Sequence, residues 1–249
     1  MLIKNYLLII LLSFLAGFAT LIGALIAPYF KKNIKGTVVG LSFAAGIMIL
    51  ISLFELIPKS LATLGGRTTF LALFLSILFM AFINFLIPHT HLIKEKRHEK
   101  SSVKTAYLTA FGIILHDFPE GFAIASAYVF SAPLGLLIVL ATFIHNIPEG
   151  FAMAIPGVKL EEKNFIFRTA LFSGFSGLLG SIAGIFALHI LPTLNSYFMS
   201  LAAGAMVFVA IHELLPMAKK YKRSSFLALG VLLSLMVYSG LFFSSSPAG

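Results

Sequence analysis

Long apolar segments alternate with short polar ones along the whole chain. Each apolar segment is close to or above the roughly 20 residues that a helix needs to cross a bilayer. Lysine, arginine, proline or glycine marks the breaks between segments. The pattern predicts an all-α integral membrane protein with eight transmembrane helices in a single domain over 1–249. The predicted helices cover 5–29, 36–58, 68–88, 104–130, 133–157, 166–190, 195–218 and 225–243.

Composition supports this interpretation, because 59% of the residues are hydrophobic and only 11% are charged. Soluble domains carry roughly 25% charged residues, and disordered chains lack so much apolar surface. The chain has no cysteine, which excludes disulfides and thiolate metal ligands. The net charge of +9 sits in short runs between apolar segments. We therefore expect membrane lipid as a partner, and no nucleic acid.

The distribution of basic residues predicts the orientation of the chain. With the N-terminus outside, fifteen of the eighteen lysine and arginine residues fall in the inside loops. Such asymmetry is typical of cytoplasmic loops. We expect a multi-pass protein of the cell (inner) membrane with both termini outside. A cytoplasmic loop over 89–103 then carries His89, His91 and His98.

Two internal repeats indicate an inverted architecture. HDFPEGFAIA at 116–125 matches HNIPEGFAMA at 145–154 in seven of ten positions. A second repeat relates 43–61 to 201–219 and matches Glu55 with Glu213. Members of each pair lie on helices of opposite direction, which predicts a 3+2+3 inverted-repeat arrangement. Inverted repeats with proline-interrupted helices are typical of secondary transporters with a site near the bilayer midplane.

Five of the nine acidic residues fall within the predicted spans. A charge at the centre of a membrane helix costs about 2.5–3.5 kcal/mol on insertion scales. Such groups are therefore expected to line a cavity, to pair, or to bind an ion. The five are Glu55, Asp117, Glu120, Glu149 and Glu213.

The repeated motif predicts a metal site. His116 and Glu120 are four residues apart and share a helix face, as do His145 and Glu149. Two imidazoles with two carboxylates suit Zn²⁺, Fe²⁺, Mn²⁺, Co²⁺ or Cd²⁺. Asp117 and Asn146, one residue after each histidine, offer further oxygen ligands. The alternative is polar side chains that merely join helices.

The doubled H-[DN]-x-P-E-G motif on the fourth and fifth spans resembles the ZIP (Zrt/Irt-like) metal transporters, most closely their prokaryotic zinc-uptake branch. The resemblance implies a transporter, often a homodimer, that moves divalent metal into the cytoplasm. It implies that His116, Glu120, His145 and Glu149 hold the main metal. Asp117 and Asn146 would face a second position, sharing Glu120 and Glu149. Many relatives complete that position with a glutamate on helix 6, which has no acidic residue here, so we expect one strong site and at most a weak second one.

Outside the motif, Glu55 near the outer end of helix 2 is a candidate for guiding metal inward. His212 and Glu213, near the inner end of helix 7, are candidates for its release. A role in helix interfaces is the alternative for all three. His89, His91 and His98 could accept or sense metal, or simply belong to a solvated basic loop.

Three functions fit the same ligands. The first is a divalent-metal importer, with zinc preferred by resemblance, and the second is a metal exporter or sensor. The third is an intramembrane metalloenzyme, which needs an open coordination position and a general base. We expect no enzyme, because the acidic groups are all assigned as ligands or path residues.

Overall fold

The computed structural model describes residues 2–30, 33–86, 99–159 and 163–245, and these ranges contain helices and no strand. The long helices are α1 (Leu2–Ile26), α2 (Ile34–Ile51), α4 (Gly66–Leu86), α5 (Glu99–Phe130), α6 (Ala132–Lys159), α7 (Lys163–Ile190), α8 (Asn195–Val209) and α10 (Ser224–Ser245). Shorter pieces are η1 (Ala27–Phe30), η2 (Ser52–Leu56), α3 (Ile57–Leu64), η3 (Pro192–Leu194), η4 (Ala210–Leu214) and α9 (Leu215–Lys219). The predicted loop residues His89, His91 and His98 lie outside the described ranges.

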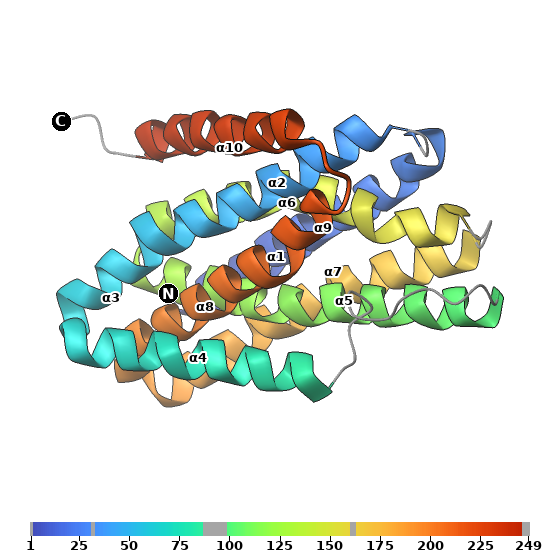
Figure 1. Cartoon of the computed structure of the whole chain (residues 1–249). Helices are drawn as coiled ribbons and strands as arrows, with labels where there is room; N and C mark the ends of the chain where they lie inside the picture. The colour runs from blue at the N-terminus through green and yellow to red at the C-terminus, as the bar shows by residue number, and fades with distance from the viewer. Residues whose placement is uncertain (1, 31–32, 87–98, 160–162, 246–249) are drawn as a thin grey trace.

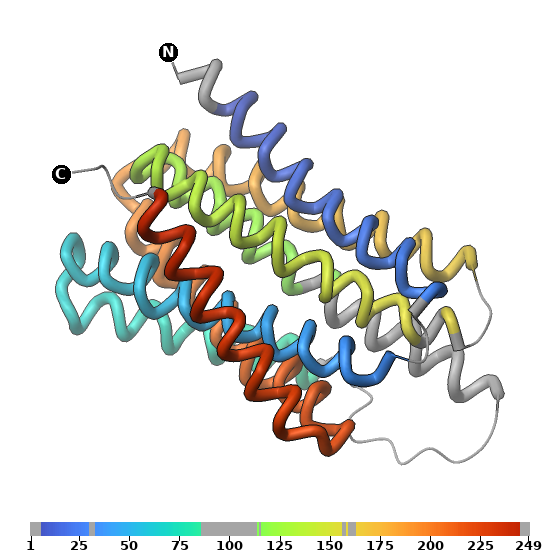
Figure 2. Tube along the Cα trace, turned by 90° about the horizontal axis from the view of Figure 1, so that it is seen from above, coloured from blue at the N-terminus to red at the C-terminus, as the bar shows by residue number. Residues whose placement is uncertain are grey.

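The helices form one elongated bundle (Figure 1). Within the described ranges, seven helical segments are long and apolar enough to cross a membrane, and the 32-residue α5 is a further long helix among them. The predicted all-helical membrane fold is therefore confirmed. α5 begins at Glu99 rather than at 104, so residues 99–103 are helical. α1 starts and α10 ends at the same end of the bundle, opposite the α9–α10 turn (Figure 2).

Two of the predicted helices are interrupted by a turn of π-helix. These turns, Ser52–Leu56 and Ala210–Leu214, each precede a short α-helix with proline in its first turn. A proline cannot donate to the carbonyl four residues earlier, and its ring pushes that carbonyl away. A π-turn is one way for a helix to absorb this change. Glu55 and Glu213 lie in the two π-turns.

The outer helices pack in two equivalent pairs. α2 packs against α10, and α8 packs against α4. In the first pair, a Cβ atom on Gly46 would lie 2.8 Å from Ser234 Cβ, and in the second, one on Gly204 would lie 3.0 Å from Ser76 Cβ. Gly46 and Gly204 are matched positions of the second repeat. The same glycine-to-serine approach thus recurs in both halves, as the inverted arrangement requires.

The remaining four long helices, α1, α5, α6 and α7, surround the repeated motif. α5 packs closely on α7, and α6 packs closely on α1. A Cβ atom on Gly121 would lie 2.7 Å from the carbonyl carbon of Gly177, and one on Gly150 would lie 2.8 Å from that of Thr20. Glycine is required at both positions because the backbones are nearly in contact. Such small-residue contacts are typical of helix association in membranes.

Large apolar side chains cover much of the outer surface, as expected where lipid is the solvent. α4 shows this most clearly, because several of its phenylalanine side chains are exposed. The exposed phenylalanines of α4 are Phe70, Phe74, Phe79, Phe82 and Phe85.

Candidate metal site

The two copies of the motif face each other across the contact between α5 and α6. His116 forms an ion pair with Glu149, and Nε2 of His145 lies 3.0 Å from Oε1 of Glu120. Each histidine therefore contacts the glutamate of the other helix rather than the one four residues further along its own. All four side chains are buried. The structure thus brings together the four residues that the motif predicted.

Three of these residues form the tightest group. His116, Glu120 and Glu149 each offer one ligand atom, and those atoms lie within 4.8 Å of one another. That spacing allows one cation to contact all three, since zinc binds nitrogen and oxygen at about 2.0–2.2 Å. His145 joins the group through its contact with Glu120.

A backbone contact orients His145. Its Nδ1 donates a hydrogen bond of 2.8 Å to the carbonyl oxygen of Ala141, one turn earlier on α6. Because a carbonyl oxygen can only accept, Nδ1 carries a proton, and Nε2 is the ring atom that faces Glu120. Metal-binding histidines are typically held by such a second hydrogen bond. The ring is thereby prepared to bind a cation that lies between it and the carboxylate.

The carboxylates lack enough donors within the protein. Among the described residues, Oε2 of Glu120 and Oε2 of Glu149 have no hydrogen-bond partner, although both are buried. Buried charged groups normally pair or coordinate metals, because leaving them unpaired is costly. A divalent cation would satisfy these oxygens. These unpartnered carboxylate oxygens are evidence for a metal site that does not depend on the sequence motif.

Asp117 and Asn146 occupy equivalent positions but make different contacts. Ser173 Oγ of α7 donates to Asp117 Oδ2. Nδ2 of Asn146 donates a 3.0 Å hydrogen bond to the carbonyl oxygen of Ala16 on α1. Each side chain thus contacts the helix that packs most closely on its own, α7 for Asp117 and α1 for Asn146.

A small cavity lies beside these two side chains, and Oδ1 of Asp117 is also 3.5 Å from Nε2 of His116. Asp117, Asn146 and Glu120 line the cavity, together with hydroxyl groups such as Ser173. Its volume of about 10 Å³ is close to the minimum for a single water molecule. A second cation here would meet oxygen ligands alone. Ser173 was missed by the sequence analysis, and its only signal is the stripe of serine and glycine along α7.

The predicted path residues lie outside this group and have partners of their own. Glu55 is buried, forms an ion pair with Lys59, and accepts a 2.8 Å hydrogen bond from the hydroxyl of Tyr238 on α10. His212 is exposed, and its Nδ1 lies 3.2 Å from Nδ2 of Asn84 on α4. Lys59, Tyr238 and Asn84 were not anticipated from the sequence. Their contacts favour structural roles at least alongside any transport role.

Glu213 is buried in the second π-turn, beside His212 in the chain. Within the described residues, the group of ligand atoms that lie within 4.8 Å of one another contains neither His212 nor Glu213.

Comparison with known proteins bears on this geometry. The family model described as ZIP Zinc transporter matches residues 88–245. The zinc transporter ZupT of Streptococcus mutans is 36% identical over 248 residues, covering 91% of this chain and 93% of that protein. The chain belongs to the ZIP family. ZupT of Escherichia coli O7:K1 is 36% identical over 96% of the chain and 98% of that protein, and ZupT of Stenotrophomonas maltophilia is 35% identical over 84% of both.

Membership of the ZIP family confirms the resemblance carried by the doubled motif. The matched range contains both copies of the motif and the second copy of the longer repeat. The relatives are aligned over most of their own length, so the comparison concerns the whole bundle. The chain is therefore a multi-pass membrane protein of a family whose bacterial members named above are zinc transporters.

Proposed function

We propose that the protein carries divalent transition metal across the membrane, with zinc as its main substrate. His116, Glu120, His145 and Glu149 bind the metal between α5 and α6. The observation that carries this proposal is the buried group of one imidazole and two carboxylates, from His116, Glu120 and Glu149, whose ligand atoms lie within 4.8 Å of one another. Carboxylate oxygens of this group have no hydrogen-bond partner among the described residues. The zinc relatives support the choice of metal, while the ligand chemistry also accommodates Fe²⁺, Mn²⁺, Co²⁺ and Cd²⁺.

Asp117 and Asn146 belong to a second, weaker position that shares Glu120 and Glu149. No acidic side chain of α7 supports it, because Ser173 stands against Asp117 instead. A neutral hydroxyl and a carboxamide neutralise a divalent cation less well than carboxylates do. Metal at this position would therefore exchange faster than metal at the histidine site.

Transport is directed into the cytoplasm, across the cell (inner) membrane, with both termini outside. The excess of lysine and arginine in alternate loops supports this orientation. The chain has no cysteine, so a single introduced cysteine shows on which side of the membrane its position lies. Gly66→Cys should react with an impermeant maleimide in intact cells, and Lys220→Cys only after permeabilisation. The reverse pattern would invert the assignment.

The main test is metal uptake into proteoliposomes with Zn²⁺, Fe²⁺, Mn²⁺, Co²⁺ and Cd²⁺ in parallel. His116→Ala and Glu149→Gln should abolish saturable uptake while the purified proteins keep their helical content. His189→Ala is the matched control, because this histidine lies at the end of α7 against the ring of Tyr6 and outside the site. Normal uptake by His116→Ala and Glu149→Gln would refute the assignment.

The same experiment separates a carrier from an enzyme. A carrier moves metal into a sealed vesicle and leaves no chemical product, whereas a metalloenzyme needs metal only as a resident group. Tight zinc binding without flux, in protein shown to be inserted, would favour a sensor or an enzyme. Flux that depends on Glu149 excludes both as the principal function.

A further inference from the structure

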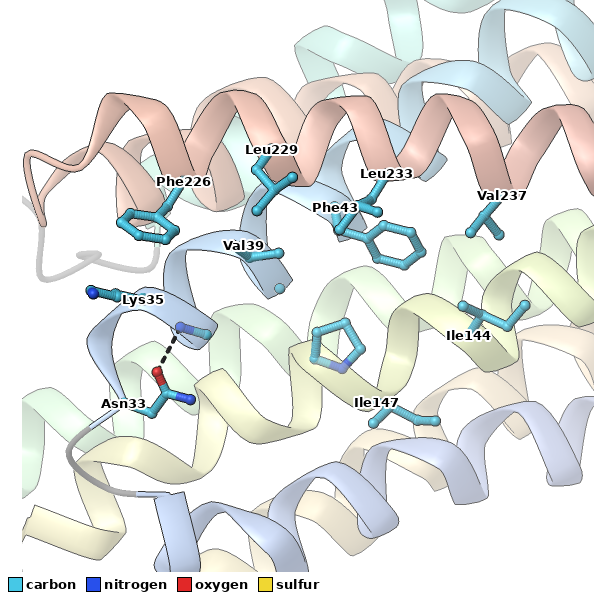
Figure 3. A pocket seen from close by; sticks show the side chains of 13 residues that line it. Asn33, Lys35, Val39, Phe43, Ile144, Ile147, Phe226, Leu229, Leu233 and Val237 are labelled. Atoms are coloured by element: carbon cyan, nitrogen blue, oxygen red, sulfur yellow. Dashed lines mark hydrogen bonds between the residues drawn. The ribbon is translucent and has the colours of Figure 1, made fainter.

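An open groove runs along the outside of the bundle between α2, α6 and α10 (Figure 3). Its volume is about 630 Å³. Phe226, Leu229, Leu233 and Val237 of α10 form one wall, and Val39 and Phe43 of α2 lie below them (Figure 3). Ile144, Ile147 and Pro148 of α6 complete it. The groove is distinct from the metal site, because the imidazoles and carboxylates do not line it.

Polar groups are confined to one end of the groove. Asn33 and Lys35, at the start of α2, lie there (Figure 3). Lys35 Nζ lies 5.3 Å from the centre of the Phe226 ring, a cation–π contact that holds the ammonium at the mouth. No ion pair joins Lys35 to a carboxylate in the described part of the chain. This end of the groove therefore has a positive charge without an ion-pair partner, next to the apolar part of the groove.

Asn33 adds a donor to the same mouth. Its Oδ1 accepts a 2.9 Å hydrogen bond from the backbone N–H of Gly36 and so caps α2. This contact fixes the carboxamide with its oxygen toward the helix. The Nδ2 group has no acceptor among the described residues and remains able to donate to an anion.

The length of the groove matches one leaflet of a bilayer. Its wall on α10 extends from Phe226 to Val237, which at 1.5 Å per residue is about 16 Å. Half of the hydrocarbon core of a bilayer is about 15 Å. A fatty acyl chain that enters from the headgroup region would therefore extend along the whole groove.

The charge at this end selects the headgroup. A second, basic hollow lies at the same end of α10 and is lined by Lys219, Lys222 and Arg223. Together with Lys35 these side chains make a positive surface at the depth of the headgroups. Basic pockets between membrane helices are a recognised setting for anionic lipids.

We propose that this groove is a binding site for one anionic phospholipid, with an acyl chain along the apolar wall and the phosphate between Lys35 and Asn33. The lipid also contacts the helix that carries His145 and Glu149, because Ile144, Ile147 and Pro148 form the floor of the groove. A bound acyl chain fills the groove between α6 on one side and α2 and α10 on the other. The site does not depend on the metal assignment.

Because the chain has no tryptophan, a single introduced one reports on its own surroundings. Phe43→Trp puts the reporter in the groove, nine residues into α2. Phe172→Trp is the matched control, since it lies nine residues into α7 and its native side chain is 64% exposed. Each protein is reconstituted into phosphatidylcholine vesicles that contain brominated phosphatidylglycerol or, separately, brominated phosphatidylcholine at the same mole fraction.

In the Phe43→Trp protein, phosphatidylglycerol should bind at the groove about fivefold more strongly than phosphatidylcholine, as judged by quenching of the tryptophan. This is the preference that one lysine near a phosphate provides. The control should show no preference. Adding Lys35→Gln to Phe43→Trp should reduce the preference, whereas adding Lys163→Gln, at the start of α7, should leave it intact. If Phe43→Trp does not fold, Leu233→Trp provides the reporter from α10.

Equal quenching by the two lipids in the groove would overturn the proposal, because the groove would then be ordinary lipid-facing surface. A preference that Lys35→Gln does not reduce would overturn it as well. Protection from both lipids would mean that protein, such as a second copy of this chain, covers the groove, and this outcome also contradicts a lipid site.

Discussion

The contact between α5 and α7 offers a sensitive test of the packing beside the metal site. A Cβ atom on Gly121 would lie 2.7 Å from the carbonyl carbon of Gly177 and 2.9 Å from the backbone nitrogen of Ser181. The carbonyl oxygen of Gly177 would be closer still. Since relaxed carbon contacts need about 3.5 Å, Gly121→Ala must separate the two backbones by at least about 0.8 Å.

The opposite side of the same contact is the control. A Cβ atom on Gly177 would lie 3.5 Å from the carbonyl oxygen of Asp117 and 4.0 Å from its Cβ, which are ordinary distances. Both substitutions gain the same helix propensity, about 1 kcal/mol over glycine. The difference between Gly121→Ala and Gly177→Ala therefore isolates the steric clash.

We expect Gly121→Ala to be less stable than Gly177→Ala by about 1–3 kcal/mol, the typical cost of overpacking. Because Gly121 directly follows Glu120, its displacement also moves a metal ligand, and zinc uptake should fall with stability. Unfolding in detergent, followed by the helical circular dichroism signal, measures the first effect, and proteoliposome uptake measures the second. Equal stability of the two variants would refute the close approach of α5 and α7.

Further predictions concern contacts outside the histidine site. Tyr238→Phe removes a hydrogen bond to the buried Glu55 carboxylate and should lower the free energy of unfolding by about 1.5–3 kcal/mol, as measured by detergent melts; an unchanged melt would contradict that bond. Ser173→Ala leaves Asp117 without its donor and should cost about 1–3 kcal/mol, yet saturable zinc uptake should persist because the histidine site is intact. Replacing the three loop histidines together should change the rate of uptake but preserve it, and a well-expressed but inactive triple variant would give the loop a required role.

The sequence predicted the membrane fold because lipid imposes simple rules on a chain. Every spanning helix must supply some 20 apolar residues, so the number of helices can be predicted from hydropathy. The spacing of His116 and Glu120 on one face follows from helical periodicity alone. The longer repeat matched Glu55 with Glu213, but it did not predict that both would lie in π-turns. That detail depends on how a proline is accommodated locally.

Partners distant in the chain could not be predicted, because they depend on how helices cross. Asp117 meets Ser173 and Glu55 meets Tyr238 across 56 and 183 residues of sequence. The crosswise pairing of His116 with Glu149 likewise depends on the rotation of α5 and α6 about their axes. The sequence by itself determined which groups must avoid lipid. Only the tertiary structure decided which of them meet, since close approach at glycines such as Gly121 sets the final register of the helices.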